Sequence, residues 1–175
     1  MSSVDEQIAA WRASFHAASD RQLALLIGYS AQNFVNWRKR GAIPEAAYER
    51  VAAILPDHQR AQARQARREE LGQQLLYEGR CLAIFIAPSF DAYGRRFSPL
   101  EYAAQMRDFT SFFDEIALAC AERIADRKEE KGGNATEAFE SIVKDIGKPD
   151  APDRLETFYE EVTQRARYWR YGDGE

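Results

Sequence analysis

Apolar residues recur every three or four positions along most of the chain, which is the spacing of one face of an α-helix. Ile8, Trp11 and Phe15 form the first such stripe. Little of the sequence shows the strict alternation of apolar and polar residues that is typical of a half-buried strand. The pattern predicts an all-α protein.

Residues that begin or end helices divide the first third of the sequence into four predicted helices. Ser30 can accept a hydrogen bond from the free amides of a first turn, and Gly28 and Gly41 suit the ends of helices. Pro44 suits a first turn because it has no amide to leave unpaired, and Pro56 should end the helix that Pro44 opens. These signals place helices at about residues 4–16, 19–28, 30–41 and 44–55.

The composition changes after Pro56. Residues 57–80 are rich in Gln, Ala and Arg, which suits an exposed connecting helix or linker. We therefore expect a first domain at 1–56, the linker at 57–80 and a second helical domain at 81–175. The segment 81–90, CLAIFIAPSF, is compatible with a strand or a helix, and we favour a helix; residues 90–97 are expected to form a loop.

A long amphipathic helix is predicted in the second domain. It begins with the capping box of Ser98 and Glu101 and runs to about Lys131, which at 1.5 Å per residue is roughly 50 Å. That is longer than the core of so small a domain requires, so we expect the stripe to serve oligomerisation, with an intramolecular bundle as the alternative. The residues assigned to oligomerisation are Met106, Phe109, Phe113, Ile116 and Cys120. Two shorter helices are expected at about 134–147 and 153–171.

The residues from Asp20 to Lys39 have the order that a helix-turn-helix requires. Ala24 is small where two helices would cross closely, and Gly28 stands where the turn needs a left-handed backbone. Phe34 and Trp37 follow as inward-facing positions of the second helix. An ordinary helical hairpin is the alternative interpretation.

Within residues 19–55 the pattern L-A-x-x-x-G-x-S-x-x-x-x-x-N-W-x-x-R-x-x-I-P resembles the N-terminal domain of bacteriophage CI-type repressors. It consists here of Leu23-Ala24, Gly28, Ser30, Asn36-Trp37, Arg40 and Ile43-Pro44. The resemblance implies a lambda-repressor-like helix-turn-helix head that binds double-stranded DNA as a homodimer on an inverted repeat. Phe34 departs from the family, which more often has a smaller aliphatic residue there. We expect no peptidase-like C-terminal domain, because residues 81–175 look helical.

The polar residues of this region suit contacts with DNA. Amide side chains can pair with adenine in the major groove and a methyl group can contact thymine, so base readout is assigned to the start of the recognition helix. Contacts with phosphates are assigned to polar and cationic residues at the start of the predicted helix 19–28 and at both ends of the predicted helix 30–41. The base-contacting residues are Ala31, Gln32, Asn33 and Asn36; the phosphate-contacting residues are Arg21, Gln22, Ser30, Arg38, Lys39 and Arg40. The alternative is a merely solvated helix face.

The net charge of −4 is unusual for a DNA-binding protein, but the charge is unevenly distributed. Residues 1–70 hold ten Arg or Lys and eight Asp or Glu, whereas residues 71–175 hold 14 and 20. The acidity therefore belongs to the second module. This favours DNA binding by the first, and leaves as the alternative an antitoxin or antirepressor-like adaptor whose acidic module engages a regulatory protein partner.

The sequence offers little for other functions. His16 and His58 have no companions that would make a catalytic or metal site, and Cys81 and Cys120 are far apart, as expected for buried thiols in a reducing compartment. We expect no enzyme activity, no metal and no cofactor. The acidic N-terminal residues and the lack of an apolar run of about 20 residues predict a cytoplasmic protein without a membrane partner.

Overall fold

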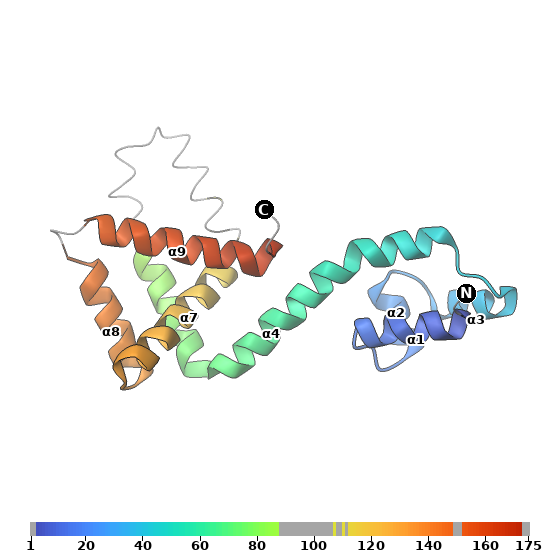
Figure 1. Cartoon of the computed structure of the whole chain (residues 1–175), viewed down its shortest axis with the longest axis horizontal. Coiled ribbons are helices and arrows are strands. Elements are labelled where there is room, and N and C mark those ends of the chain that lie inside the picture. Colours follow the sequence, from blue (N-terminus) through green and yellow to red (C-terminus); the bar gives the residue numbers. More distant parts are fainter. Residues whose placement is uncertain (1–2, 88–106, 108–109, 111, 149–151, 173–175) are drawn as a thin grey trace. The chain divides into compact units, whose positions relative to one another are not determined.

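The computed structural model describes residues 3–87, 107, 110, 112–148 and 152–172. In these ranges every regular element is a helix and no strand occurs, so the predicted all-α class is confirmed for this part of the chain (Figure 1). The chain divides into two compact units, Met1–Ala63 and Arg64–Glu175. Each unit has a hydrophobic core of its own.

Unit 1 contains three short helices and the first part of a long one. They are α1 (Val4–Ser14), α2 (Asp20–Leu26), α3 (Ala31–Arg40) and α4 (Glu45–Ile86). Hydrogen bonds to nearby side chains cap the N-termini of α1 and α2. Ser3 and Glu6 form a reciprocal capping box at α1, and Ser19 Oγ accepts a hydrogen bond from the Gln22 amide at 3.2 Å at α2. Gly41, with φ of 68°, closes α3.

Aromatic residues dominate the core of unit 1. Phe15 and Phe34 are fully buried, and Trp11 and Trp37 are nearly so. The Phe34 and Trp37 rings stack with centroids 5.0 Å apart. Aliphatic side chains from α1 and α2 fill the remaining space, and the predicted Ile8, Trp11 and Phe15 stripe is buried.

Helix α4 continues through Pro56, so the prediction that Pro56 ends a helix is wrong. A proline inside a helix costs about 3 kcal/mol, because it removes one backbone hydrogen bond and crowds the preceding turn. Here the next turn is held to α1: His58 Nε2 lies 3.0 Å from the Phe15 carbonyl oxygen, and the His58 and Phe15 rings are in contact. The helical path is interrupted instead at Gly72, where φ is 75° and ψ is 168°.

The last part of α4 lies in unit 2 and includes residues 81–86 of the ambiguous segment. Residues 81–86 are helical, as favoured from the sequence; residues 88–97, which include the expected loop, lie outside the described residues. Gly79 makes the crossing with the next helix, because a Cβ atom there would lie 2.5 Å from the Ala117 carbonyl oxygen and 2.7 Å from the Ala121 Cβ. The absence of a side chain at Gly79 lets the two helices approach closely.

The other helices of unit 2 are α7 (Phe113–Lys131), α8 (Ala135–Ile146) and α9 (Pro152–Tyr171). The capping box predicted for Asn134 and Glu137 forms. The prediction of one helix from Ser98 to Lys131 is wrong, because Phe112 has non-helical angles of −132° and 36° immediately before α7. The Phe112 ring packs on the core and lies under the Arg170 guanidinium, which favours this departure. Residues 98–106 lie outside the described residues.

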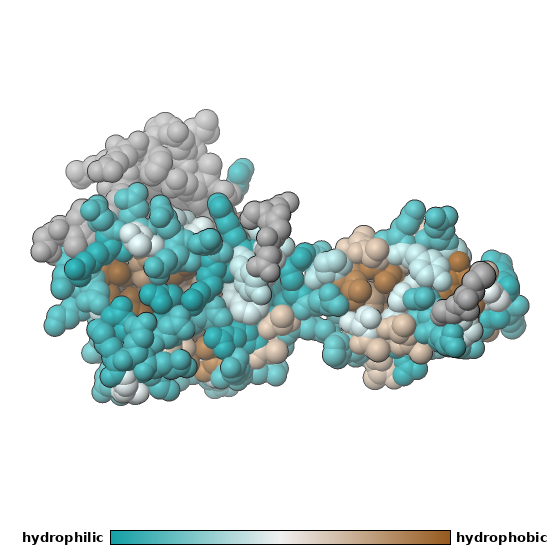
Figure 2. Space-filling model, viewed as in Figure 1, coloured by the Kyte–Doolittle hydropathy of each residue, from teal (hydrophilic) through white to brown (hydrophobic). Residues whose placement is uncertain are grey.

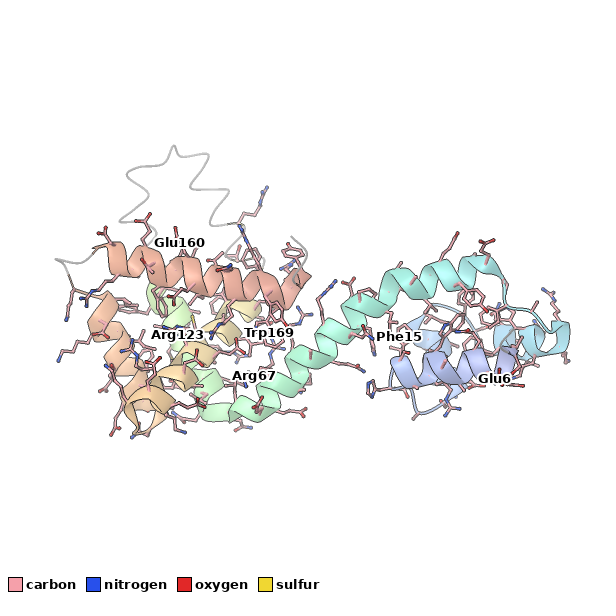
Figure 3. All side chains as sticks on the ribbon, in the orientation of Figure 1. Glu6, Phe15, Arg67, Arg123, Glu160 and Trp169 are labelled. Atoms are coloured by element: carbon pink, nitrogen blue, oxygen red, sulfur yellow. The ribbon has the colours of Figure 1, made fainter. Side chains whose placement is uncertain are left out.

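Ionic contacts join the helices of unit 2. Arg67 on α4 and Trp169 on α9, both labelled in Figure 3, donate hydrogen bonds of 2.8 Å and 3.0 Å to the two carboxylate oxygens of Glu122 on α7. Arg64 donates to Glu115 Oε1 at 2.7 Å. Glu122 is buried, so these partners compensate a carboxylate that has lost its water.

Candidate functional site

The turn between α2 and α3 has the left-handed backbone at Gly28 that the sequence predicts. Ile27 ends α2, Gly28 follows with φ of 73°, and Ser30 precedes α3. The Tyr29 amide donates to the Ala24 carbonyl oxygen at 2.7 Å, which closes the turn. Ala24 is buried, as a close approach of the two helices requires.

Helix α3 has one buried and one exposed face. Phe34 and Trp37 face the core of unit 1, and the Tyr29 ring meets the Trp37 ring edge-on at 5.2 Å. Ala31 and Gln32 at its start are exposed, and Asn36 is half-buried. The packing of Phe34 and Trp37 in the core sets the rotation of α3 about its axis. The polar residues on the opposite face of α3 therefore point to solvent.

The predicted base-reading amides are not equivalent. Gln32 Nε2 donates to Asn36 Oδ1 at 3.3 Å, so these two lie side by side one turn apart. Asn33 Oδ1 instead accepts hydrogen bonds from the Ser30 amide, at 3.1 Å, and from the Ser30 hydroxyl. Asn33 and Ser30 therefore cap α3, and a bidentate contact of Asn33 with a base would break this cap. The S-x-x-N spacing was a signal for the cap.

Arg38 was predicted to contact phosphate, but the structure pairs it with two carboxylates. Its Nε lies 2.6 Å from Asp5 Oδ1 and its Nη2 lies 2.7 Å from Asp20 Oδ2. Hydrogen bonds to Asp5 and then to Asp20 raise the pKa of Arg38 above its usual value. The guanidinium thus joins α3 to α1 and α2, and its charge is compensated inside the unit.

The remaining predicted phosphate contacts differ in how far they are already engaged. Arg21, Lys39 and Arg40 are exposed, and no ion pair to them occurs among the described residues. The side-chain oxygen Oε1 of Gln22 accepts a hydrogen bond from the Ala18 amide at 2.8 Å, so this side chain helps to cap α2. Three cations therefore remain available to an anionic ligand.

One cation near this turn was missed from the sequence. Arg50, on α4, places its guanidinium carbon 5.5 Å from the centroid of the Tyr29 ring. It lies 21 positions beyond Tyr29, and no local pattern indicated that α4 would return to the turn.

The predicted oligomerisation face requires a correction. Ile116 and Cys120 are completely buried among the helices of unit 2, and burial raises the pKa of the Cys120 thiol. They cannot present a surface to another chain, which agrees with the alternative of an intramolecular bundle. Phe113 is partly buried against the same core, while Met106 and Phe109 lie outside the described residues.

Searches for other chemistry and for relatives gave negative results. Among the described residues no three His, Cys, Asp or Glu side chains are grouped so that they could hold a metal ion. No described helix has the length and apolar character needed to cross a membrane. Comparisons with protein-family models, curated proteins and solved structures found no match to this chain.

Proposed function

We propose that this protein is a sequence-specific DNA-binding transcriptional regulator of the phage-repressor kind. In this proposal α2 and α3 form a lambda-repressor-like helix-turn-helix, and α3 enters the major groove of an operator. The observation that carries the proposal is the division of α3 into a buried aromatic face and an outer face. The outer face has amides at its start and, at its end, Lys39 and Arg40, for which no ion pair is found among the described residues.

Base readout is assigned to Gln32 and Asn36, with Ala31 beside them. The hydrogen bond from Gln32 to Asn36 orients both amides, and each side chain keeps an N–H donor and an oxygen lone pair for the edge of an adenine. Asn33 is given the role of capping the helix. Of the four base-contacting residues predicted from the sequence, this assignment keeps the three that can contact DNA without breaking the cap of α3.

The phosphate contacts are assigned to Arg21, Lys39 and Arg40. Each phosphate that a cation neutralises releases counterions, so the affinity for DNA should fall steeply with salt. Arg38 is excluded because Asp5 and Asp20 already neutralise it. Arg38→Gln should therefore lower the stability of unit 1, while Lys39→Gln or Arg40→Gln should reduce the salt slope by about one unit each.

The proposal is tested by binding of the full chain to DNA fragments from around its own gene over a range of salt concentrations. The wild type should select one fragment. A Gln32→Ala/Asn36→Ala double variant should retain only unselective binding, because each bidentate base contact discriminates by roughly 1–3 kcal/mol.

The matched control is Gln65→Ala on α4, which removes another exposed amide with a hydrogen bond four positions along its helix. It should bind as the wild type does. Retention of full selectivity by the double variant would exclude α3 as the reading element, and absence of selective binding by the wild type would exclude the proposed function.

We further propose that two chains bind one inverted-repeat operator, because pairing two heads raises the effective affinity without new base contacts. A full operator should bind two chains, and a half-site should bind one chain much more weakly. Equal affinity for the half-site would contradict the dimer.

A second candidate is a protein-binding adaptor acting through unit 2. The observation that favours it is the exposure of two apolar side chains on α4, Tyr77 at 63% and Ile84 at 59%. Residues seven positions apart lie on the same face of a helix, and exposed apolar groups on one face suit contact with another protein. This function would be supported if the wild type selected no DNA fragment and Tyr77→Ser/Ile84→Ser abolished a stoichiometric complex with a defined regulatory protein.

A further inference from the structure

Arg50 occupies an unusual position at the α2–α3 turn. Its guanidinium fills the space beside Gly28, where an added Cβ would collide with Arg50 Nη2. The same group lies over the Tyr29 ring. Gly28 therefore serves two purposes: it provides the positive φ of the turn and it leaves room for an arginine from α4.

The way in which Arg50 is held distinguishes it from three other arginines of unit 1. Arg12 pairs with Asp20, Arg38 pairs with Asp5 and Asp20, and Arg60 pairs with Asp57. No ion pair of Arg50 is found among the described residues, and its side chain is exposed. An aromatic face positions a cation without neutralising it, so the full charge remains available to an anion.

The Tyr29 ring beneath Arg50 is itself held by two contacts. The Tyr29 ring meets Trp37 edge-on, and the Tyr29 amide is bonded to Ala24. Trp37 belongs to the buried face of α3. The position of the Arg50 charge is thus coupled through two rings to the helix whose outer face carries Gln32.

We propose that Arg50 is a phosphate-binding residue that contacts the DNA backbone at the α2–α3 turn, and that Tyr29 is its positioning residue. This inference rests on the proposed function. A planar guanidinium can donate two parallel hydrogen bonds to one phosphate, which fixes orientation as well as adding affinity. The contact positions the start of α3 and carries no base specificity of its own.

The test is the salt dependence of DNA binding by Arg50→Met, which keeps an apolar stem on the Tyr29 ring and removes the charge. Its slope should fall by about one unit on selected and unselected fragments alike. Arg50→Lys should restore most of the slope. Tyr29→Leu, which keeps the cation but removes the ring, should weaken binding to the selected fragment.

The control is Arg60→Gln, which removes an arginine of α4 that is paired with Asp57, and it should leave the slope unchanged. Thermal unfolding of each variant checks that unit 1 is intact. If the wild type binds selectively and Arg50→Met has the wild-type slope with lower stability, Arg50 is a structural residue and only this inference fails. If the wild type shows no salt-dependent binding, both proposals fail.

Discussion

Unit 1 packs large aromatic rings where unit 2 packs mainly aliphatic side chains, many of them alanines. Phe15 and Phe34 fill the first core, whereas Ala119 and Ala166 lie fully buried in the second, beside larger aliphatic residues such as Ile116. Large rings allow helices of 7 to 11 residues to bury enough apolar surface, while alanines allow helices of 12 to 20 residues to approach closely. Different substitutions should therefore destabilise the two cores. In unit 1 the most damaging are those that leave a cavity, and in unit 2 those that add atoms where helices lie close together.

The units also differ in charge. Residues 1–63 hold seven Arg or Lys and six Asp or Glu, whereas residues 64–175 hold 17 and 22. In unit 2 the arginines are drawn into contacts between helices, such as Arg67 with Glu122 and Arg127 with Asp145. The visible face of unit 2 is accordingly covered mostly by hydrophilic residues (Figure 2). Several arginines of unit 2 therefore join helices, whereas in unit 1 no ion pair of Arg21, Lys39, Arg40 or Arg50 is found among the described residues.

The largest expected effect is at Phe34. Phe34→Ala should destabilise unit 1 by about 3–5 kcal/mol, because it removes a fully buried ring and leaves a cavity beside Trp37. Urea unfolding followed by tryptophan fluorescence measures the change. Val35→Ala, at a neighbouring position that is 40% exposed, should change stability by no more than about 0.5 kcal/mol. Equal effects of the two substitutions would contradict an aromatic core in unit 1.

Unit 1 was more predictable than unit 2 because its signals are local. Ser19, Ser30 and Gly41 act within one helical turn of the residues that they cap, and α2 and α3 begin and end within two residues of the expected positions. The contacts of Arg38 with Asp5 and of Arg50 with Tyr29 join residues far apart in the sequence. They depend on how the helices pack, which local spacing does not specify.

The next effect concerns the ionic contacts of unit 2. Glu122→Gln should lower stability by roughly 1–3 kcal/mol, because it removes the charge that compensates Arg67 and weakens the bond from Trp169. Glu70→Gln is the matched control, since Glu70 also pairs with Arg67, at 2.7 Å, but its side chain is 70% exposed. It should cost less than about 1 kcal/mol. Chemical unfolding followed by tryptophan fluorescence distinguishes the two.

Two glycines compare steric with conformational causes. Gly79→Ala should destabilise unit 2 by about 1–3 kcal/mol, because the new methyl group would collide with Ala117 and Ala121 on α7. Gly41→Ala in unit 1 meets no neighbouring atom within 4 Å and should cost about 1 kcal/mol, from its left-handed backbone alone. Thermal unfolding measures both. If Gly79→Ala had no effect, the close crossing of α4 and α7 would be wrong.

The two wrongly predicted helix boundaries, one in each unit, have a common physical cause. The periodic apolar residues before Lys131 predict one continuous helix. Phe112 instead has non-helical backbone angles, and its ring packs on the core beneath the Arg170 guanidinium. Pro56 predicts the end of a helix, but α4 continues beyond it, where His58 contacts the end of α1. In both cases tertiary contacts outweighed a local preference, so the sequence alone could not place the boundary.

The smallest effect depends on pH and concerns the contact between α7 and α8. Arg127 donates a 2.8 Å hydrogen bond to Asp145, and this bond, followed by the field of the nearby cations, holds the pKa of Asp145 below its usual value. Because the folded pKa lies below the unfolded value of about 3.9, the contact stabilises the protein above that pH. The stabilisation is lost as the pH falls through the folded pKa.

Asp145→Asn should therefore lower stability at neutral pH by about 0.2–1 kcal/mol, since the carboxylate is partly exposed and screened. The difference from the wild type should disappear in acid, as measured by urea unfolding at a series of pH values. Glu129→Gln, which alters an exposed carboxylate of α7 with no ion pair among the described residues, should show no such dependence. A deficit in Asp145→Asn that persisted in acid would show that the carboxylate contributes through shape rather than charge, and would weaken the view that unit 2 uses its arginines to join helices.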